Sequence, residues 1–327
     1  MTMPQPLVAI RNLSVVFPGP LRAVDDVSLD IAAGETLGVV GESGSGKSTL
    51  AKTIVDLHRP TSGQVMFEGQ SSRVLDRLWF RRQAQLVFQD AASSLSPRLT
   101  VRQLLEEPLN IHGLAIEEHW AGVRHLLGAI GLPAQVLDKY PHQVSGGQAR
   151  RIAIARALVL KPRLLIADEP TAGLDVSIQG DLLNLLRELQ QSFGLTYLIV
   201  SHNLNVIRRV TDRVAVMYLG KLVEIGPTKS LFSRPAHPYT AALIGANPVI
   251  DPRRRRPRII LRGEIPSPLR PPPGCRFHTR CGFVRDRCRA EVPPMARIAE
   301  GRETACHFPF VAASEEGSAA MPDDAGI

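Results

Sequence analysis

The sequence predicts an α/β fold: a mostly parallel β-sheet covered by helices, with an all-helical insertion and a small C-terminal extension. Three observations lead to this prediction. Strand-like and helix-like segments alternate over much of the chain, which is typical of a parallel sheet. The stretch from Thr100 to about Leu160 has only helical periodicity, so it predicts an inserted subdomain. After about Ser230 the composition shifts toward Pro, Arg and Cys.

The first two strands are expected at Leu7–Phe17 and Ala23–Ile31, because a Pro-Gly-Pro turn separates two runs rich in β-formers. Thr36–Val40 is a short apolar run between two glycines, which is typical of a buried strand. The remaining strands are expected at Gln64–Phe67, Gln85–Phe88, Leu164–Ala167, Thr196–Val200, Arg213–Tyr218 and Leu222–Ile225. Helices are expected to begin near Lys47 and to cover Val101–Leu109, Glu117–Ile130, Gly146–Leu160, Ser177–Phe193 and Leu204–Val210.

The length and composition predict one large domain with an addition. The chain has 327 residues, of which 44% are hydrophobic, and this is more than one ordinary domain needs. We expect the main domain at 5–230, with its helical subdomain at about 93–160, and an extension at 231–310. The last residues, 311–327, are small and acidic, so we expect a disordered tail.

The chain carries a formal net charge of +8, from 39 Lys and Arg against 31 Asp and Glu. Such an excess is typical of a protein with an anionic partner, such as a nucleotide, a nucleic acid or a lipid surface, and equally of a solvated basic face. The run Arg253–Arg256 leaves a similar choice between contact with lipid headgroups and a solvated linker.

The N-terminus lacks the pattern of a secretory signal. The longest apolar runs, such as Leu164–Ala167 and Leu198–Val200, are far shorter than the roughly 18 residues that a membrane span needs. We therefore expect a cytosolic protein that reaches a membrane only through partner proteins.

A phosphate loop follows the strand Thr36–Val40 and opens the next helix. Its pattern is G-x-x-x-x-G-K-S/T, and this strand–loop–helix context makes the motif specific to P-loop NTPases. Backbone N–H groups of the loop and the positive end of the helix would surround phosphate oxygens. Lys47 is expected to reach the β- and γ-phosphates of ATP, and the Ser48 hydroxyl to bind Mg²⁺. The nucleotide-binding residues predicted here are Gly41, Glu42, Ser43, Gly44, Ser45, Gly46, Lys47, Ser48 and Thr49.

Polar residues after two further strands would complete this site. Asp168 and Glu169 end a buried strand, so we expect Asp168 to hold Mg²⁺ and Glu169 to activate the attacking water as general base. His202 follows the next strand and would contact the γ-phosphate. Gln89, which also follows a strand, is a candidate to contact Mg²⁺ and water. Phe17 could stack on adenine or could be an ordinary core residue.

The order of these motifs resembles the ABC ATPase family, and one further motif is diagnostic for it. Val144-Ser145-Gly146-Gly147-Gln148 matches the family signature, with Val in place of the usual Leu. Ala172-Gly173-Leu174-Asp175 matches the loop that crosses the dimer interface, with Gly in place of the usual Ala. The resemblance implies an antiparallel β subdomain and an α-helical subdomain. It also implies that the signature residues and Asp175 complete the ATP site of the opposite subunit.

Further segments resemble the dipeptide and oligopeptide importers of that family. Gln89–Arg98 matches their segment after the glutamine, and His237–Thr240 and Pro266–Leu269, followed by Gly274–His278, match their C-terminal extension. The resemblance implies ATP hydrolysis that energises peptide uptake. Importers of nickel and of glutathione share these segments and remain alternatives. A soluble ABC ATPase of DNA repair or translation is a weaker alternative, because neither a long coiled-coil insertion nor a second cassette is present.

The same resemblance implies partners and a location. We expect a paralogous ABC ATPase, or a second copy of this chain, as the dimer partner. Two transmembrane permease subunits and an extracytoplasmic solute-binding protein would complete the transporter, and no nucleic acid is expected. The protein would act as a peripheral subunit at the cytoplasmic face of the bacterial inner membrane.

The four cysteines lie in one short segment with the spacing Cys-x5-Cys-x6-Cys-x17-Cys: Cys275, Cys281, Cys288 and Cys306. Disulfides are not expected in a cytosolic chain, and common zinc sites have closer pairs. Four thiolates can hold an iron–sulfur cluster, and members of the importer subfamily with these cysteines are candidates for a 4Fe–4S centre. Zinc, with His278 and His307 as substitute ligands, and unligated thiols remain alternatives.

Overall fold

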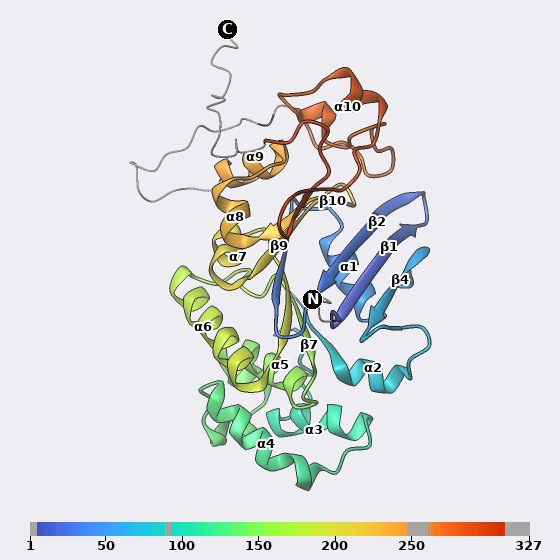
Figure 1. Ribbon diagram of the computed structural model, residues 1–327. Coiled ribbons are helices and arrows are strands. Elements are labelled where there is room, and N and C mark those ends of the chain that lie inside the picture. The colour runs from blue at the N-terminus through green and yellow to red at the C-terminus, as the bar shows by residue number, and fades with distance from the viewer. Residues whose placement is uncertain (1–4, 89, 91–92, 247–260, 262, 311–327) are drawn as a thin grey trace.

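The computed structural model describes residues 5–88, 90, 93–246, 261 and 263–310. Two sheets form the middle of the molecule, helices α3 and α4 lie at one end, and the segment with α10 lies at the other (Figure 1). The predicted tail at 311–327 and the run Arg253–Arg256 lie outside the described residues.

The larger sheet has the strand order β11-β12-β10-β9-β3-β8-β7-β6 within the part of the chain that the structure describes. Its central strands β9, β3, β8, β7 and β6 are parallel, as the alternation of strands and helices predicts. Every residue of β3, β7 and β8 is buried, because both faces of the sheet are covered, and this explains their continuous apolar runs. The strands are β3 Thr36–Val40, β6 Ala84–Val87, β7 Leu164–Asp168, β8 Thr196–Val200, β9 Arg213–Tyr218 and β10 Lys221–Pro227.

The smaller sheet is antiparallel, with the order β2-β1-β4-β5. Its strands are β1 Val8–Phe17, β2 Leu21–Ile31, β4 Ser62–Phe67 and β5 Gln70–Ser71. One hydrophobic cluster joins this sheet to α1 and to one face of the larger sheet, through residues such as Ile10, Val27, Leu37 and Ile54. Helix α1 is therefore held between the two sheets.

The helices of the main domain are α1 Lys47–Ile54, α2 Arg77–Gln83, α3 Val101–Ile111, α4 Ile116–Ala129, α5 Gly146–Leu158, α6 Val176–Phe193 and α7 Leu204–Val210. Short 3₁₀ turns at Ala134–Asp138 and Pro141–Gln143 lead into α5. A capping box between Thr100 and Gln103 fixes the start of α3. A second hydrophobic cluster, with Leu104, Leu126 and Ile152 among its residues, joins α3, α4 and α5 to the other face of the larger sheet. The inserted helical subdomain is thus packed on the sheet.

The described chain from Thr228 on forms α8 Thr228–Ser233, α9 Pro238–Ala246, a 3₁₀ turn His278–Arg280, α10 Asp286–Ala290, β11 Ala296–Ala299 and β12 Arg302–Thr304. Strand β12 pairs with β10, where Thr304 lies opposite Glu224, so this segment extends the larger sheet. The sequence does not predict β11 and β12, because each is very short and mostly exposed and neither has a clear apolar alternation.

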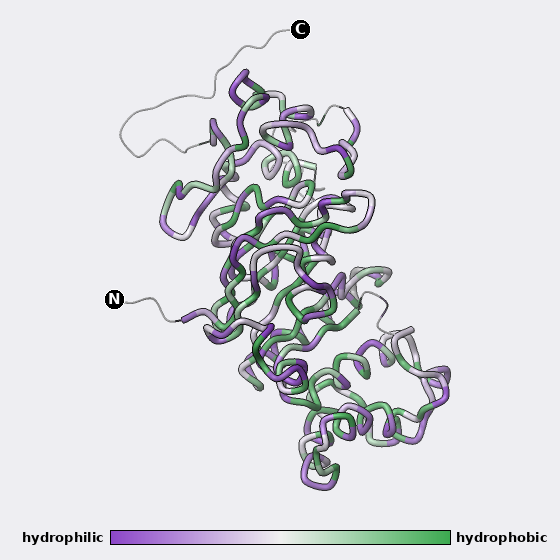
Figure 2. The backbone as a smooth tube through the Cα atoms, turned by 90° about the vertical axis from the view of Figure 1, so that its right-hand side faces the viewer, coloured by the Kyte–Doolittle hydropathy of each residue, from purple (hydrophilic) through white to green (hydrophobic). Residues whose placement is uncertain are grey.

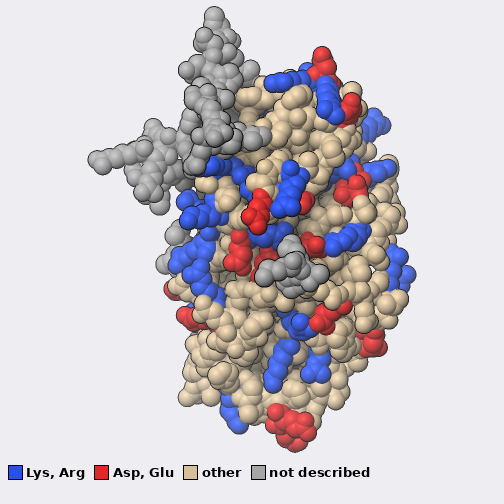
Figure 3. Space-filling model, in the orientation of Figure 1, with Lys and Arg blue, Asp and Glu red and all other residues tan. Residues whose placement is uncertain are grey.

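Hydropathy and charge are distributed as in an ordinary folded domain. Apolar segments gather in the middle of the molecule and in its helical end (Figure 2). Lys and Arg are interspersed with Asp and Glu over the face in Figure 3, so this face does not present one sign of charge. Among the described residues, the structure contains no helix with the length and apolarity of a membrane span.

Candidate functional site

Three neighbouring strands carry the predicted site residues at one edge of the larger sheet. The phosphate loop follows β3, His202 follows β8, and Glu169 follows β7. The strands are parallel and β8 lies between β3 and β7, so their carboxyl ends meet at the same edge. Ligands of α/β proteins bind in this position.

Two glycines of the phosphate loop are required by close backbone contacts. A Cβ on Gly41 would lie 2.2 Å from the Met217 carbonyl oxygen, and a Cβ on Gly46 would lie 2.0 Å from the Ala23 carbonyl oxygen. Gly46 also has φ 101°, a conformation that side chains disfavour. The loop is therefore enclosed by β2 on one side and by β9 on the other, while its residues Ser43 and Gly44 are exposed.

Lys47 is a buried cation that is held by neutral groups. Its Nζ donates hydrogen bonds to the carbonyl oxygens of Gly41, at 2.8 Å, and of Glu42, at 2.9 Å, and lies 3.3 Å from Ser45 Oγ. Burial lowers the pKa of Lys47, and the nearby carboxylates Glu169, Asp168 and Glu42 oppose that shift. Within the described chain, no carboxylate lies at ion-pair distance from this ammonium group. A phosphate would supply the missing negative charge.

Ser48 and Asp168 meet where the sequence predicts a magnesium ion. Ser48 Oγ donates a hydrogen bond of 3.2 Å to Asp168 Oδ1. Burial raises the pKa of Asp168, and the bond from Ser48 partly offsets this. A hydroxyl and a carboxylate side by side are oxygen ligands of the type that Mg²⁺ prefers, so the residues present fit this ion.

Glu169 is held in a defined orientation by the end of β8. Its Oε1 accepts a hydrogen bond of 3.0 Å from the His202 backbone N–H and lies 2.8 Å from His202 Nδ1, while Ser201 Oγ donates to Oε2 at 3.2 Å. Its backbone has φ 52°, which is uncommon for a residue other than glycine and is found where a site holds a side chain under strain. The predicted base and the predicted γ-phosphate contact therefore lie in direct contact.

The signature motif caps helix α5. Ser145 Oγ accepts a hydrogen bond of 3.2 Å from the Gln148 backbone N–H, and Gln148 Oε1 accepts one of 3.1 Å from the Ser145 N–H. A Cβ on Gly146 or Gly147 would meet nothing within 4 Å in the described structure. Contacts inside the chain therefore do not explain these two glycines, whereas close approach by another molecule would.

The predicted interface loop ends at the start of α6. Gly173 has φ 70°, which explains why glycine replaces the usual Ala at this position. Asp175 is exposed and is the residue from which α6 begins. No sequence motif marks Arg150, whose Nη2 donates a hydrogen bond of 3.1 Å to the Ala172 carbonyl oxygen and so connects α5 to this loop.

Two other predicted residues have less defined positions. Phe17 is half-buried against the cluster between the sheets, and its ring makes an edge contact with His58 at a centroid distance of 5.3 Å. Both alternatives for Phe17 therefore remain open. Gln89 lies outside the described residues.

Comparisons with known proteins identify the family. A family model described as ABC transporter matches residues 24–172, and one described as oligopeptide/dipeptide transporter, C-terminal region, matches residues 223–288. The chain is 50% identical over 299 residues to the Probable peptide ABC transporter ATP-binding protein y4tS of Sinorhizobium fredii. This alignment covers 90% of this chain and 84% of that protein. It is 45% identical over 319 residues to the oligopeptide transport ATP-binding protein AppF of Bacillus subtilis, with coverage of 92% and 97%.

The chain belongs to the ATP-binding subunits of ABC transporters. The resemblance that its motifs indicate is thereby confirmed, and so is the fold class. Among solved structures, cbiO1 of Clostridium perfringens, part of an ABC transporter complex, superposes with a TM-score of 0.64 at 30% identity, covering 70% of this chain and 91% of that one. A dimeric ATP-binding cassette in a post-hydrolysis state with ADP and Pi has a TM-score of 0.60 at 31% identity, covering 68% and 98%.

The cysteines of this ABC subunit converge although they are spread along the sequence. All four line one small cavity, together with His237, His278 and His307. Burial raises the pKa of Cys275 and of Cys306 to about 11, and it also raises the pKa of Cys281. However, the described residues contain no group of three or more His, Cys, Asp or Glu side chains that could hold a metal ion as they stand. The predicted iron–sulfur or zinc centre is therefore without direct support here.

Proposed function

We propose that this chain binds and hydrolyses ATP to energise the uptake of peptides through partner permeases. The match of residues 223–288 to the C-terminal region of oligopeptide and dipeptide transporters carries this proposal, because ABC cassettes in general need no such segment. In addition, the two relatives described above are named as peptide and oligopeptide transport proteins, and their alignments cover 90% and 92% of this chain.

The geometry of the site supports a specific role for each residue. The buried charge of Lys47 would neutralise the β- and γ-phosphates, and Ser48 and Asp168 would hold Mg²⁺, which shields the developing charge. Glu169 would take the proton of the attacking water. His202, which contacts Glu169 at 2.8 Å, would orient that carboxylate and contact the γ-phosphate. Phe17 would lie against adenine. The role of Gln89 at Mg²⁺ and water is proposed from the sequence alone, since Gln89 lies outside the described residues.

The exposed start of α5 supports a two-subunit site. Ser145 and the glycines after it would bind the γ-phosphate held by the Lys47 of a second cassette, and Asp175 would contact that cassette. Cleavage of the γ-phosphate then removes the anion between the two cassettes. We propose that the resulting opening drives two transmembrane permeases at the cytoplasmic face of the bacterial inner membrane, with cargo delivered by an extracytoplasmic binding protein. The second cassette is a paralogue or another copy of this chain.

Uptake measured in cells tests this function. We expect cells that lack this chain to lose uptake of labelled di- and oligopeptides, and the wild-type chain to restore it. The Lys47→Ala variant should be expressed and fail to restore uptake, because the buried ammonium group is removed from the phosphate site. Lys229→Ala, outside the phosphate site, serves as the matched control and should restore uptake fully.

Parallel uptake of nickel and of glutathione separates the alternatives. If cells without the chain lose uptake of nickel or of glutathione but still take up peptides, the cargo is nickel or glutathione and not a peptide. If all three cargoes enter normally without the chain, the proposed role in import is wrong.

We also propose that the four cysteines hold a 4Fe–4S cluster. The shared cavity supports this, because all four thiols line it and four thiolates are the usual ligands of such a cluster. When bound, the cluster would crosslink the segment.

Metal analysis of anaerobically purified protein tests this centre. We expect absorption near 400 nm and about four irons per chain, and we expect Cys288→Ser to lose most of both. Ser267→Ala, outside the cavity, should keep them. Stoichiometric zinc without iron would instead indicate the zinc alternative, and a colourless, metal-free protein would indicate unligated thiols.

A further inference from the structure

The part of residues 231–310 that the structure describes, here called the cysteine segment, makes direct contact with the phosphate loop at Glu42. The backbone N–H of Glu42 donates a hydrogen bond of 2.9 Å to the Tyr239 hydroxyl. Arg280 Nη1 donates to one carboxylate oxygen of Glu42 at 2.7 Å, and Nη2 donates to the other at 3.1 Å. This two-bond geometry is the strongest form of an arginine–carboxylate pair. No sequence motif marks this pair, because 238 positions separate Arg280 from Glu42.

Arg280 is fixed by its surroundings. Its side chain is only 7% exposed, and its guanidinium group lies 5.9 Å from the centre of the Tyr218 ring. The hydrogen bonds to Glu42 raise the pKa of Arg280, so it remains a cation. Tyr218, Tyr239 and Phe277 pack together beneath it, with ring centroids 4.7 to 5.4 Å apart. A buried, preformed arginine loses little freedom when it holds a carboxylate.

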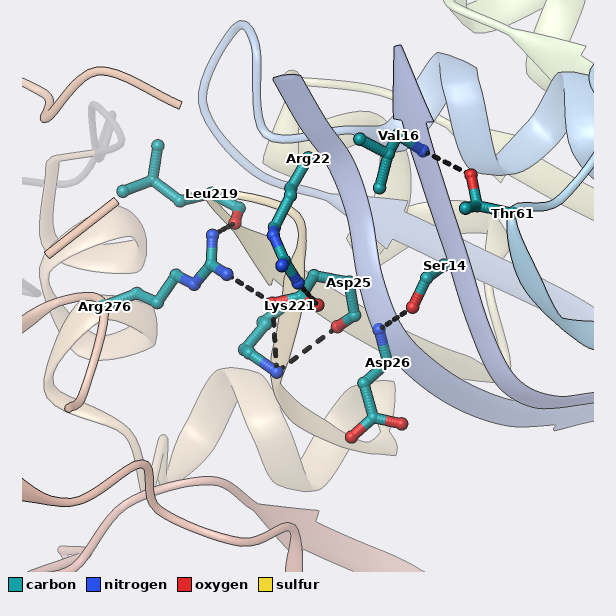
Figure 4. A network of polar contacts seen from close by, with 9 residues as sticks. All are labelled: Ser14, Val16, Arg22, Asp25, Asp26, Thr61, Leu219, Lys221 and Arg276. Atoms are coloured by element: carbon teal, nitrogen blue, oxygen red, sulfur yellow. Dashed lines mark hydrogen bonds and ion pairs between the residues drawn. The ribbon is translucent and has the colours of Figure 1, made fainter. Parts of the chain in front are cut away.

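A second arginine of the same segment holds the neighbouring part of the loop's enclosure. Arg276 donates to the Leu219 carbonyl oxygen at 2.9 Å and forms a buried ion pair with Asp25 (Figure 4). Lys221 also pairs with Asp25, at 3.4 Å. Asp25 lies two residues after Ala23, whose carbonyl oxygen touches Gly46 of the phosphate loop. The segment therefore holds the loop directly at Glu42 and indirectly near Gly46.

Arg280 affects the charge of the phosphate site as well as the stability of the fold, because its partner Glu42 is a carboxylate of the phosphate loop. Lys47 Nζ lies 2.9 Å from the Glu42 carbonyl oxygen, and the Glu42 carboxylate is close enough to oppose the lowering of the Lys47 pKa by burial. An uncompensated Glu42 carboxylate would therefore also repel phosphates bound there. Arg280 neutralises that carboxylate and turns it toward the cysteine segment. The loop then offers the phosphates its N–H groups and Lys47 without a competing negative charge.

We propose that Arg280 is a positioning residue for nucleotide binding, through which the cysteine segment sets the affinity of the phosphate loop for ATP. The proposal rests on the proposed function, since it requires that the loop bind ATP. It assigns the C-terminal segment a role at the nucleotide site of its own subunit, in addition to any role in cargo or assembly.

Nucleotide binding to the full chain with Mg²⁺ tests this role. We expect Arg280→Gln to weaken ATP binding by about tenfold, because Glu42 is left charged and unpaired. Glu42→Gln added to Arg280→Gln should restore the affinity to within about twofold of the wild type, because the repelling charge is gone. A purely structural role of Arg280 predicts the opposite: the double variant would bind no better than Arg280→Gln. Arg280→Lys, which keeps the charge, should lie between the wild type and Arg280→Gln.

Arg287→Gln is the matched control. Arg287 belongs to the same segment but pairs with Glu291 on the exposed face of α10, so this variant should bind ATP like the wild type. Thermal unfolding of each variant shows that it is folded at the temperature of the measurement. Wild-type affinity in Arg280→Gln, or no recovery in the double variant, would overturn the inference. A wild-type chain that does not bind ATP would instead overturn the proposed function itself.

Discussion

Replacing Glu169 by Gln is expected to lower the rate of ATP hydrolysis by about 10²- to 10⁴-fold, the usual contribution of a general base. Gln keeps the size of the side chain and can keep a hydrogen bond to the His202 N–H, which now lies 3.0 Å from Glu169 Oε1. It cannot accept the proton of the attacking water. ATP binding should therefore be retained, and Mg²⁺-dependent dimers with trapped ATP should accumulate.

The measurement is phosphate release by purified protein, with nucleotide binding followed in parallel. Glu188→Gln is the matched control, because Glu188 is an exposed glutamate of α6 and this variant should hydrolyse ATP at the wild-type rate. Equal rates for the wild type and Glu169→Gln would remove Glu169 as the base. Loss of ATP binding in Glu169→Gln would mean that the residue acts in binding instead.

The sequence predicts the central strands closely because their signal is local. Thr36–Val40, Thr196–Val200 and Arg213–Tyr218 begin and end where expected. Each is a short apolar run buried in the middle of a sheet, with turn residues or polar residues beside it. The phosphate loop is equally local, since its glycines, lysine and serine follow one another. Their positions in space follow from the rule that parallel strands end at one edge.

The contacts of the C-terminal segment could not be predicted in this way. Arg276 and Asp25 are 251 positions apart in the chain, and nothing in either neighbourhood marks the pair. Strand β12 has three residues and forms only because β10 presents a free edge to it. The cysteine spacing predicts that the thiols meet, but it does not specify the distances between them, which depend on the turn at His278–Arg280 and on α10.

The attachment of that segment depends on one buried carboxylate, Glu224 of β10. Its side chain is fully buried and accepts hydrogen bonds of 2.9 Å from the backbone N–H groups of Ala236 and His237 and of 3.0 Å from Arg302 Nη2. Replacing Glu224 by Ala leaves the Arg302 cation and two N–H groups without this partner. We expect the free energy of unfolding to fall by about 3–5 kcal/mol, as when one member of a buried ion pair is removed.

Denaturant unfolding of the full chain measures this loss. Glu303→Ala is the matched control, because Glu303 is an exposed glutamate of the adjacent strand β12, and its effect should stay within about 0.5 kcal/mol. Similar midpoints for the two variants would contradict the role of Glu224. Glu224 holds His237 at the start of α9, and Tyr239 of that helix accepts a hydrogen bond from the Glu42 N–H. We therefore expect Glu224→Ala to weaken ATP binding as well, when binding is measured at a temperature at which the variant is still folded. Unchanged ATP affinity in a folded Glu224→Ala chain would show that α9 keeps its position without this carboxylate.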